Sequence, residues 1–292
     1  MGAYVMSFTF IIIVPFVIGY IVVYFSKFDG KSSMKFQIIT PWLSIYILLA
    51  FTYLLYLEGL ICIIMAAPVF MVLSSLGGLL GGEFANDKKR LNIIFINIII
   101  ILPFFSIAVE NKIEKPIELM QVDTQIEIKS DPGTVWENIV TVYEISDEEN
   151  RNSLFMLMGF PKPIKAELDY KGIGGTRLAI FDKGLFFTET VTEWDYQKSF
   201  SFKIKADPNS VPPEALDEHV LVGGEYFDIL DGKYEIESVD GNVTLHLQSK
   251  FKLSTNFNFY SGFWSKLIMK DIQNNILNIV KQRSEKNELN NN

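Results

Sequence analysis

Residues 260–283 read YSGFWSKLIMKDIQNNILNIVKQR and decide the fold of the C-terminal part of this 292-residue chain. Apolar side chains recur there every three or four residues, which predicts one long amphipathic helix. Its apolar stripe comprises Trp264, Leu267, Ile268, Ile272, Ile276, Ile279 and Val280. Such a stripe needs a second apolar surface to cover it, so the rest of the domain must supply one.

Alternating apolar and polar residues before this helix predict that surface. In residues 198–205, Phe200, Phe202 and Ile204 alternate with serines and lysines, which indicates a strand with one apolar face. Ser130-Asp131-Pro132 predicts the start of a short helix. We expect an α+β fold in which a curved antiparallel sheet wraps around the C-terminal helix. The predicted strands are residues 122–129, 165–171, 175–182, 184–194, 198–205, 232–239 and 243–253.

The first 110 residues have a different character and predict a transmembrane anchor. Four apolar runs, each about long enough to cross a bilayer as a helix, lie at residues 4–25, 38–57, 59–80 and 92–109. Glu58-Gly59 predicts the turn between the second and third runs. The expected order is therefore anchor (1–110), linker (111–121), helix-and-sheet domain (122–283) and a polar, disordered tail (284–292).

Basic residues between the apolar runs predict the orientation of the anchor. Lys27, Lys31 and Lys35 follow the first run, and residues 88–90 (KKR) follow the third, so both loops should be cytoplasmic. Both chain ends, and with them the C-terminal domain, should then lie outside the cytoplasm, at a bacterial cytoplasmic (inner) membrane. Gly77 and Gly81 have the spacing of close helix packing, through which the chain could also form oligomers.

Charge and cysteine content exclude several kinds of function. Of the 26 basic and 34 acidic residues, 6 and 4 precede Glu110, which leaves 20 and 30 and a charge of −10 for the C-terminal part. That part has no electrostatic basis for binding nucleic acid. The one cysteine, Cys62, lies in the third apolar run, so the C-terminal domain has no disulfide, thiol nucleophile or cysteine metal site. No cofactor and no metal are predicted.

Several motifs resemble one superfamily of helix-grip domains. They are Ile126-Glu127-Ile128, Asp131-Pro132, Val135-Trp136, Gly172-x-Gly174-Gly175-Thr176-Arg177, Phe187-x-Glu189, Trp194, the stretch from Leu216 to Tyr234, Leu247-x-Ser249 and Trp264. Together with the closing helix they resemble the START, polyketide-cyclase and pollen-allergen (SRPBCC) superfamily over residues 122–283, and in particular a bacterial subgroup with membrane-attached members. The superfamily includes carriers, sensors and cyclases, so the resemblance implies a fold more than a reaction.

The resemblance implies an apolar cavity between the sheet and the C-terminal helix. The inward-facing candidates for ligand binding are Phe186, Trp194, Phe200, Phe202, Tyr234, Phe251, Trp264 and Ile268, with Tyr226 and Arg177 as polar candidates. Thr188, Thr190 and Thr192 are spaced two residues apart between Phe186 and Trp194, so they should lie on the same face of the predicted strand. The alternative is that these aromatic residues fill the core and leave no void. Arg177 could bind a ligand carboxylate, or pair with Glu189 or Glu193 on the next strand.

The candidate catalytic residues are Asp217 and His219, which would share one face of an extended segment. An Asp that orients a His forms a general base, but the same pair could simply fix a loop. The other histidine, His246, falls on the polar face of its predicted strand. The sequence therefore favours a membrane-tethered binding module for a hydrophobic or amphipathic molecule, such as a lipid or an envelope metabolite. The alternative is a cyclase-, dehydratase- or hydrolase-like enzyme that uses Asp217 and His219.

Overall fold

The structure is a computed structural model, and it describes residues 9–26, 33–86, 101, 115–150, 153–207, 221–239 and 242–291. The chain divides into two compact units, residues 1–116 and 117–292. Each unit has its own packing and is considered by itself.

The first unit is helical throughout its described part. A π-helical turn η2 (Thr9–Ile13) leads into α1 (Val14–Phe25), which is followed by α2 (Met34–Leu54) and α3 (Leu60–Asn86). Glu58 and Gly59 lie in the connection between α2 and α3, as predicted. By length and apolar composition, α2 and residues 60–85 of α3 are long enough to cross a membrane, whereas residues 9–25 form a shorter apolar helix.

Two predicted features of this unit fall outside the described residues. The fourth apolar run, 92–109, is described only at residue 101, so the number of four helices is not established. The basic residues of both loops lie outside as well, except Lys35, which is in the first turn of α2.

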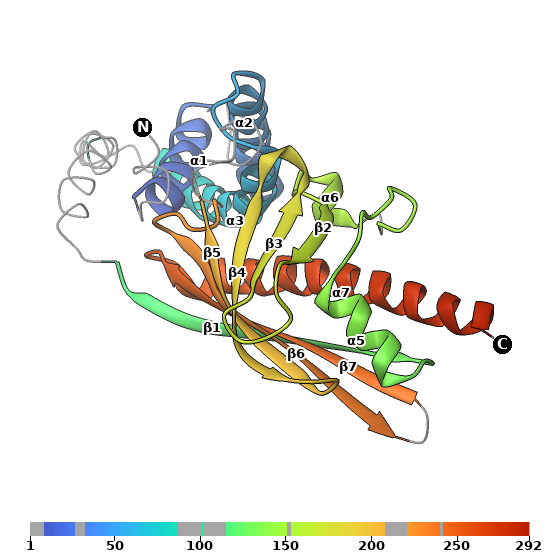
Figure 1. Ribbon diagram of the computed structural model, residues 1–292. Helices are drawn as coiled ribbons and strands as arrows, with labels where there is room; N and C mark the ends of the chain where they lie inside the picture. Colours follow the sequence, from blue (N-terminus) through green and yellow to red (C-terminus); the bar gives the residue numbers. More distant parts are fainter. Residues whose placement is uncertain are drawn as a thin grey trace. The chain divides into compact units, whose positions relative to one another are not determined.

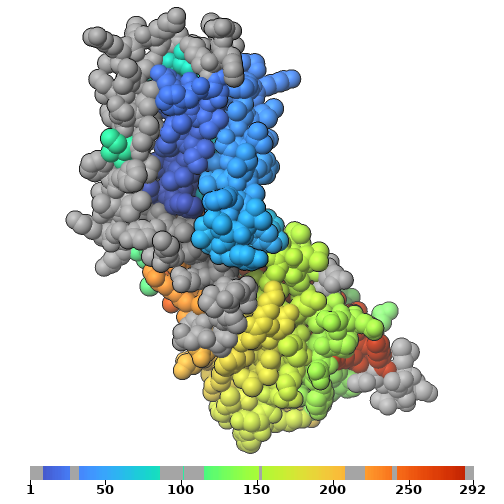
Figure 2. Space-filling view, turned by 90° about the horizontal axis from the view of Figure 1, so that it is seen from above, coloured from blue at the N-terminus to red at the C-terminus, as the bar shows by residue number. Residues whose placement is uncertain are grey.

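Glycines allow α1, α2 and α3 to approach closely. A β-carbon at Gly77 or Gly81 of α3 would collide with the backbone of Phe16 or Tyr20 of α1, and one at Gly78 would collide with the backbone of Gln37 in α2. The predicted small-residue packing thus occurs between helices of the same chain. The surfaces of α1 and α2 lie side by side in the space-filling view (Figure 2). Whether Gly77 and Gly81 also support oligomers stays a prediction.

The second unit is built on one sheet of seven antiparallel strands, in the order β1-β7-β6-β5-β4-β3-β2. The sheet curls into a half-barrel, and the long helix α7 runs across it (Figure 1). This α+β arrangement agrees with the predicted one. The strands are β1 (Ile117–Ile128), β2 (Pro163–Leu168), β3 (Thr176–Phe181), β4 (Phe186–Asp195), β5 (Ser199–Ala206), β6 (Phe227–Val239) and β7 (Asn242–Ser254).

Three helices accompany the sheet: α5 (Pro132–Val140), α6 (Leu154–Leu157) and α7 (Asn258–Asn291). The side chain of Asp131 caps α5 by accepting a hydrogen bond from the Thr134 amide at 3.0 Å, as the Asp-Pro motif predicts. The main core lies where α5 and α7 meet the strands. It contains Ile128, Val135, Trp136, Ile139, Val140, Phe200, Phe202, Tyr234, Ile236, Val243, Leu245, Leu247, Leu277 and Val280.

Two predicted boundaries of this unit are wrong. Strand β1 begins at Ile117, so residues 117–121 of the predicted linker pair with β7 instead. Helix α7 continues through the predicted disordered tail to Asn291. Ser284 is fully buried, and Asn138 of α5 donates to its hydroxyl at 3.1 Å. The polar composition of residues 284–292 does not predict this helical extension, because a contact that stabilises it comes from α5, which is distant in the sequence.

The predicted inward-facing side of β4 is also wrong for the first part of the strand. Phe187, Glu189 and Val191 are buried, whereas Phe186 and Thr188 are only partly buried and Thr190 is exposed. A β-bulge between Val191 and Glu193 then reverses the faces, so that Trp194 packs against the core. An extra residue on one strand changes which side chains point inward, and alternation alone cannot reveal it.

We expect Gly77→Ala to destabilise the helical unit by about 1–3 kcal/mol, because the added methyl group meets backbone atoms of α1 that cannot rotate away. Thermal unfolding of the full chain in mild detergent measures this effect. Leu76→Ala is the control, since Leu76 on the same helix is 48% exposed. Equal melting temperatures for the two variants would contradict the packing.

Candidate functional site

A buried ion pair lies inside the half-barrel. Arg177 of β3 and Glu189 of β4 are directly opposite each other in the strand register. Their side chains are 4% and 8% exposed, and Nη1 of Arg177 donates to Oε2 of Glu189 at 2.5 Å. The pair confirms Glu189 as the neighbouring-strand partner of Arg177. Two charges in this position require full hydrogen bonding, because each loses its hydration.

Helix α5 supplies the remaining acceptors for Arg177. Its Nε donates to the Val140 carbonyl at 3.2 Å, and its Nη2 donates to the Ile139 carbonyl at 3.3 Å. These carbonyls end α5, where the helix dipole favours a positive charge. The short helix that Asp131-Pro132 starts therefore ends at the guanidinium and holds it against the sheet.

Two aromatic rings enclose the charged pair. The guanidinium carbon of Arg177 lies 6.0 Å from the ring centre of Phe202 and 5.9 Å from that of Tyr234, within the range of cation–π attraction. Burial raises the pKa of Glu189, although the positive charge of Arg177 opposes this rise. Burial likewise raises the pKa of the Tyr234 hydroxyl. The group thus combines a cation, an anion and a neutral phenol away from water.

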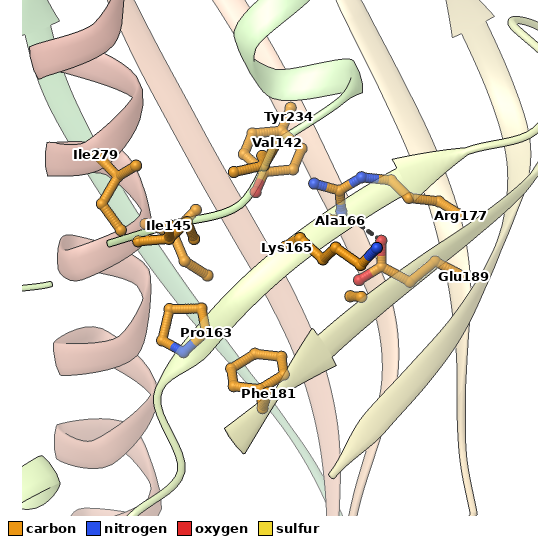
Figure 3. Close-up of a pocket in the computed structure, with 12 residues that line it drawn as sticks. Val142, Ile145, Pro163, Lys165, Ala166, Arg177, Phe181, Glu189, Tyr234 and Ile279 are labelled. Carbon is orange, nitrogen blue, oxygen red and sulfur yellow. Dashed lines mark hydrogen bonds and ion pairs between the residues drawn. The ribbon is translucent and has the colours of Figure 1, made fainter. Parts of the chain in front are cut away.

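A pocket of about 60 Å³ lies between this group and α7. Figure 3 shows Arg177 and Glu189 on one side of it and Ile279 of α7 on the other. Most of its lining is apolar, and the polar residues are gathered on the strands. The lining comprises Val142, Ile145, Pro163, Lys165, Ala166, Arg177, Ala179, Phe181, Glu189, Tyr234, Ile276 and Ile279.

The size of the pocket limits what it can hold in this state. Sites for drug-sized ligands measure about 300–1,000 Å³, whereas a water molecule occupies about 30 Å³ of liquid. The described pocket of about 60 Å³ thus has room for little more than solvent. A larger ligand requires one wall to move.

The wall formed by residues 142–150 is irregular, and it is held from two sides, by α7 and by β2. Arg283 of α7 donates from Nε to Oε1 of Glu149 at 2.7 Å and from Nη2 to Oε2 at 3.0 Å. Asn275 of α7 donates to the side-chain oxygen of Asn150 at 3.0 Å. On its other side, the wall makes three backbone hydrogen bonds with β2, two between Val142 and Ala166 and one from the Ile145 amide to the Ile164 carbonyl, and the Asn150 side chain donates to the Pro163 carbonyl at 3.3 Å. Side chains of α7 and the main chain of β2 therefore hold this wall together.

The predicted ligand-binding residues separate into three groups. Among them, Arg177 and Tyr234 line the pocket. Trp194, Phe200 and Phe202 belong to the main core with Trp136, and neighbouring ring centres there are 5.0–5.8 Å apart. The remainder lie away from this pocket: Phe251, Ile268 and Tyr226 are buried, and Trp264 and Phe186 are partly exposed.

The proposed catalytic pair is not described. Asp217 and His219 both lie within residues 208–220, outside the described part of the chain. His246 faces the polar side of β7, where its Nε2 lies 3.6 Å from Glu237. Within the described residues, no group of three or more His, Cys, Asp or Glu side chains is arranged to hold a metal ion.

Sequence reasoning missed most of the pocket wall. Val142, Ile145 and Pro163 come from a stretch without periodicity, so no pattern marks them, and nothing in the sequence singles out Lys165 or Ala179. A charged residue inside an apolar strand, Glu189, is the one available signal.

The inward face of β3 also differs from the one that its apolar residues suggest. The apolar phase of this strand predicts that Leu178 and Ile180 face inward. Instead Arg177, Ala179 and Phe181 do so, and Leu178 is 40% exposed. The face of β3 is therefore set by the ion pair with β4 and not by hydrophobicity alone.

The domain is a curled seven-stranded antiparallel half-barrel with a long C-terminal helix. No protein-family model and no curated protein matches the sequence. Similar solved structures include an uncharacterized protein from Rhizobium leguminosarum, at 11% identity over 57% of this chain and 98% of that one, with a TM-score of 0.36. A protein from Thermus thermophilus is similar at 13% identity over 56% and 97%, with a TM-score of 0.36. Ara h 8.0201 is similar at 9% identity over 56% and 98%, with a TM-score of 0.32.

We expect Glu149→Gln to loosen the pocket wall and to lower the free energy of unfolding at neutral pH. Hydrogen bonds from Arg283 are the largest cause that lowers the pKa of Glu149, from 4.5 to about 2. The stabilisation is therefore complete above pH 4.5 and is lost as the pH falls towards 2. We estimate about 1–2 kcal/mol, reduced for screening because the Glu149 side chain is 22% exposed.

Denaturant unfolding between pH 2 and pH 7, with hydrogen exchange of residues 142–150, measures this contribution. The variant should differ from the wild type at pH 7 and match it near pH 2. Glu148→Gln removes the same charge from an exposed neighbour and is the control. If both variants behave alike, the wall does not depend on the bond to Arg283.

Proposed function

We propose that this chain is a membrane-anchored binding protein of the SRPBCC type, which holds a small amphipathic molecule, such as a lipid or an envelope metabolite, between its sheet and α7. The observation that carries this proposal is the composition of the pocket. A single buried ion pair, Arg177 with Glu189, stands in a wall that is otherwise mainly apolar. A ligand with a polar head and an apolar body matches such a wall.

The energetics of the ion pair support a binding role. A buried pair is no more stabilising than well-packed apolar residues of similar size, so stability alone does not account for it. In an apolar pocket, a guanidinium beside a carboxylate and a phenol can orient a ligand carboxylate, phosphate or hydroxyl through charge-assisted hydrogen bonds. Lys165 lies on the same wall, where its Nζ pairs with Glu167 at 3.0 Å.

Ligand entry on this proposal requires the wall at residues 142–150 to move away from α7. The present pocket of about 60 Å³ is the closed form, and Arg283 and Asn275 hold it closed. Opening must break the side-chain hydrogen bonds from α7 and the backbone bonds to β2, each worth about 1 kcal/mol net, and burial of the apolar part of the ligand would have to offset this cost.

The anchoring part of the proposal depends on the helical unit. Helices α2 and α3 have the length and apolar composition that a membrane span needs. A domain tethered at a bilayer could exchange apolar cargo with the lipid without exposing it to water for long. The basic loops favour an orientation with the domain outside the cytoplasm.

The ligand prediction is tested by native mass spectrometry of the full chain, purified in mild detergent. We expect a co-purified small molecule with the wild type and its loss with Ala179→Ile, which fills the pocket from β3. Leu178→Ile is the matched control, because Leu178 is on the same strand but points out of the pocket. Both variants must retain the wild-type melting temperature.

A second pair of variants tests the role of the charges. Arg177→Met alone should cost about 3–5 kcal/mol because it leaves Glu189 buried without a partner. Arg177→Met with Glu189→Leu removes both charges and should fold, while it loses the ligand or accepts a wholly apolar one. Unchanged ligand in the double variant would refute recognition by the ion pair. A wild-type protein that carries no small molecule would count against the binding function itself.

The orientation is tested by thiol labelling in intact cells, in a Cys62→Ala background. We expect Asn290→Cys to react with a membrane-impermeant reagent, because the domain should lie outside the cytoplasm. Lys31→Cys, in the first basic loop, should react only after lysis. The reverse pattern would place the domain in the cytoplasm.

A further inference from the structure

The first turns of α7 carry an apolar stripe on the side that faces away from the sheet. Phe259 is 80% exposed, Phe263 is 57% exposed and Leu267 is 39% exposed. Their spacing of four residues aligns them along one face of the helix. The faces turned away from the stripe are covered, since Ile268 and Met269 are buried. The stripe, defined as Phe259, Phe263 and Leu267, therefore does not pack in the core of the domain.

The charge around the stripe is unlike that of the rest of the domain. Residues 258–270 contain two lysines and no acidic residue, although the chain from Glu110 onward has a charge of −10 (20 basic and 30 acidic residues). Lys266 and Lys270 are exposed and lie on the same side of the helix as the stripe. Exposed aromatic residues flanked by lysines are typical of helices that lie in the interface of an anionic bilayer.

The stripe lies at the end of the domain that is tethered. Ile117, the first residue of β1, pairs with Ser254, and α7 begins at Asn258, four residues later. The apolar run 92–109 ends only seven residues before Ile117. Seven extended residues span at most about 25 Å. If the chain is anchored as proposed above, the start of α7 is thus confined close to the lipid headgroups.

We propose that this stripe docks on the bilayer surface, with Phe259, Phe263 and Leu267 inserted at the headgroup boundary and Lys266 and Lys270 contacting anionic lipid. The inference rests on the proposed anchoring. It adds to that tether a direct contact between the stripe and the bilayer surface. Docking would orient the domain relative to the membrane and keep its sheet and α7 near the source of a lipid-derived ligand.

The test uses the full chain with Cys62→Ala, reconstituted in lipid nanodiscs that contain phosphatidylglycerol and phosphatidylcholine. A nitrobenzoxadiazole fluorophore is attached at Leu267→Cys, and at Tyr196→Cys as a control, because Tyr196 is 61% exposed on the β4–β5 turn. We expect the label at 267 to be quenched by doxyl-labelled lipid, and to be quenched by aqueous iodide roughly threefold less than the label at 196.

Two comparisons distinguish insertion of the stripe into lipid from its burial against protein. Adding Phe259→Ser and Phe263→Ser should abolish lipid quenching at position 267, and nanodiscs of phosphatidylcholine alone should weaken it. Equal iodide access at 267 and 196 would overturn the docking. Protection from iodide without lipid quenching would also overturn it, because a second protein surface would then cover the stripe. A chain that fails to enter nanodiscs would instead refute the anchoring.

Discussion

The structure of the C-terminal domain depends on the mutual burial of α7 and the curled sheet. Leu277 and Val280 of α7 are fully buried against a core that includes Phe200 of β5 and Leu245 of β7. Neither surface could remain in water, since each buried apolar side chain contributes about 1.5–3 kcal/mol. This requirement also forces polar groups of α7 inside. Gln273 is satisfied there by Thr124 and Ser249, at 3.1 and 2.8 Å.

The same curvature creates the candidate site. Because the sheet curls around α7, the inner faces of β3 and β4 meet the end of α5, and Arg177 and Glu189 are buried together with two helix carbonyls as acceptors. Three hydrogen bonds from the guanidinium, one of them to Glu189, compensate part of the lost hydration, and a buried pair of this kind does not by itself add stability. The pocket beside them therefore combines an apolar body with one polar end, which is the basis of the proposed recognition of an amphipathic molecule.

Helix α7 performs three tasks along its length. Its first turns present Phe259 and Phe263 to the surroundings, its middle closes the pocket with Ile276 and Ile279, and its last turns hold the 142–150 wall through Arg283. These positions lie on one continuous helix, which places the exposed apolar stripe and the pocket wall on the same element.

The sequence by itself determined the elements and their class. Period-two and helical patterns identified all seven strands, the capped helix after Asp131 and the long closing helix, because burial of one face imposes a local period on the residues. The tertiary structure decided the site. A bulge after Val191 inverted the inner face of β4, and Asn275 met Asn150, 125 residues away, and Arg283 met Glu149, 134 residues away. Such contacts depend on how distant segments are brought together, and no local pattern encodes that distance.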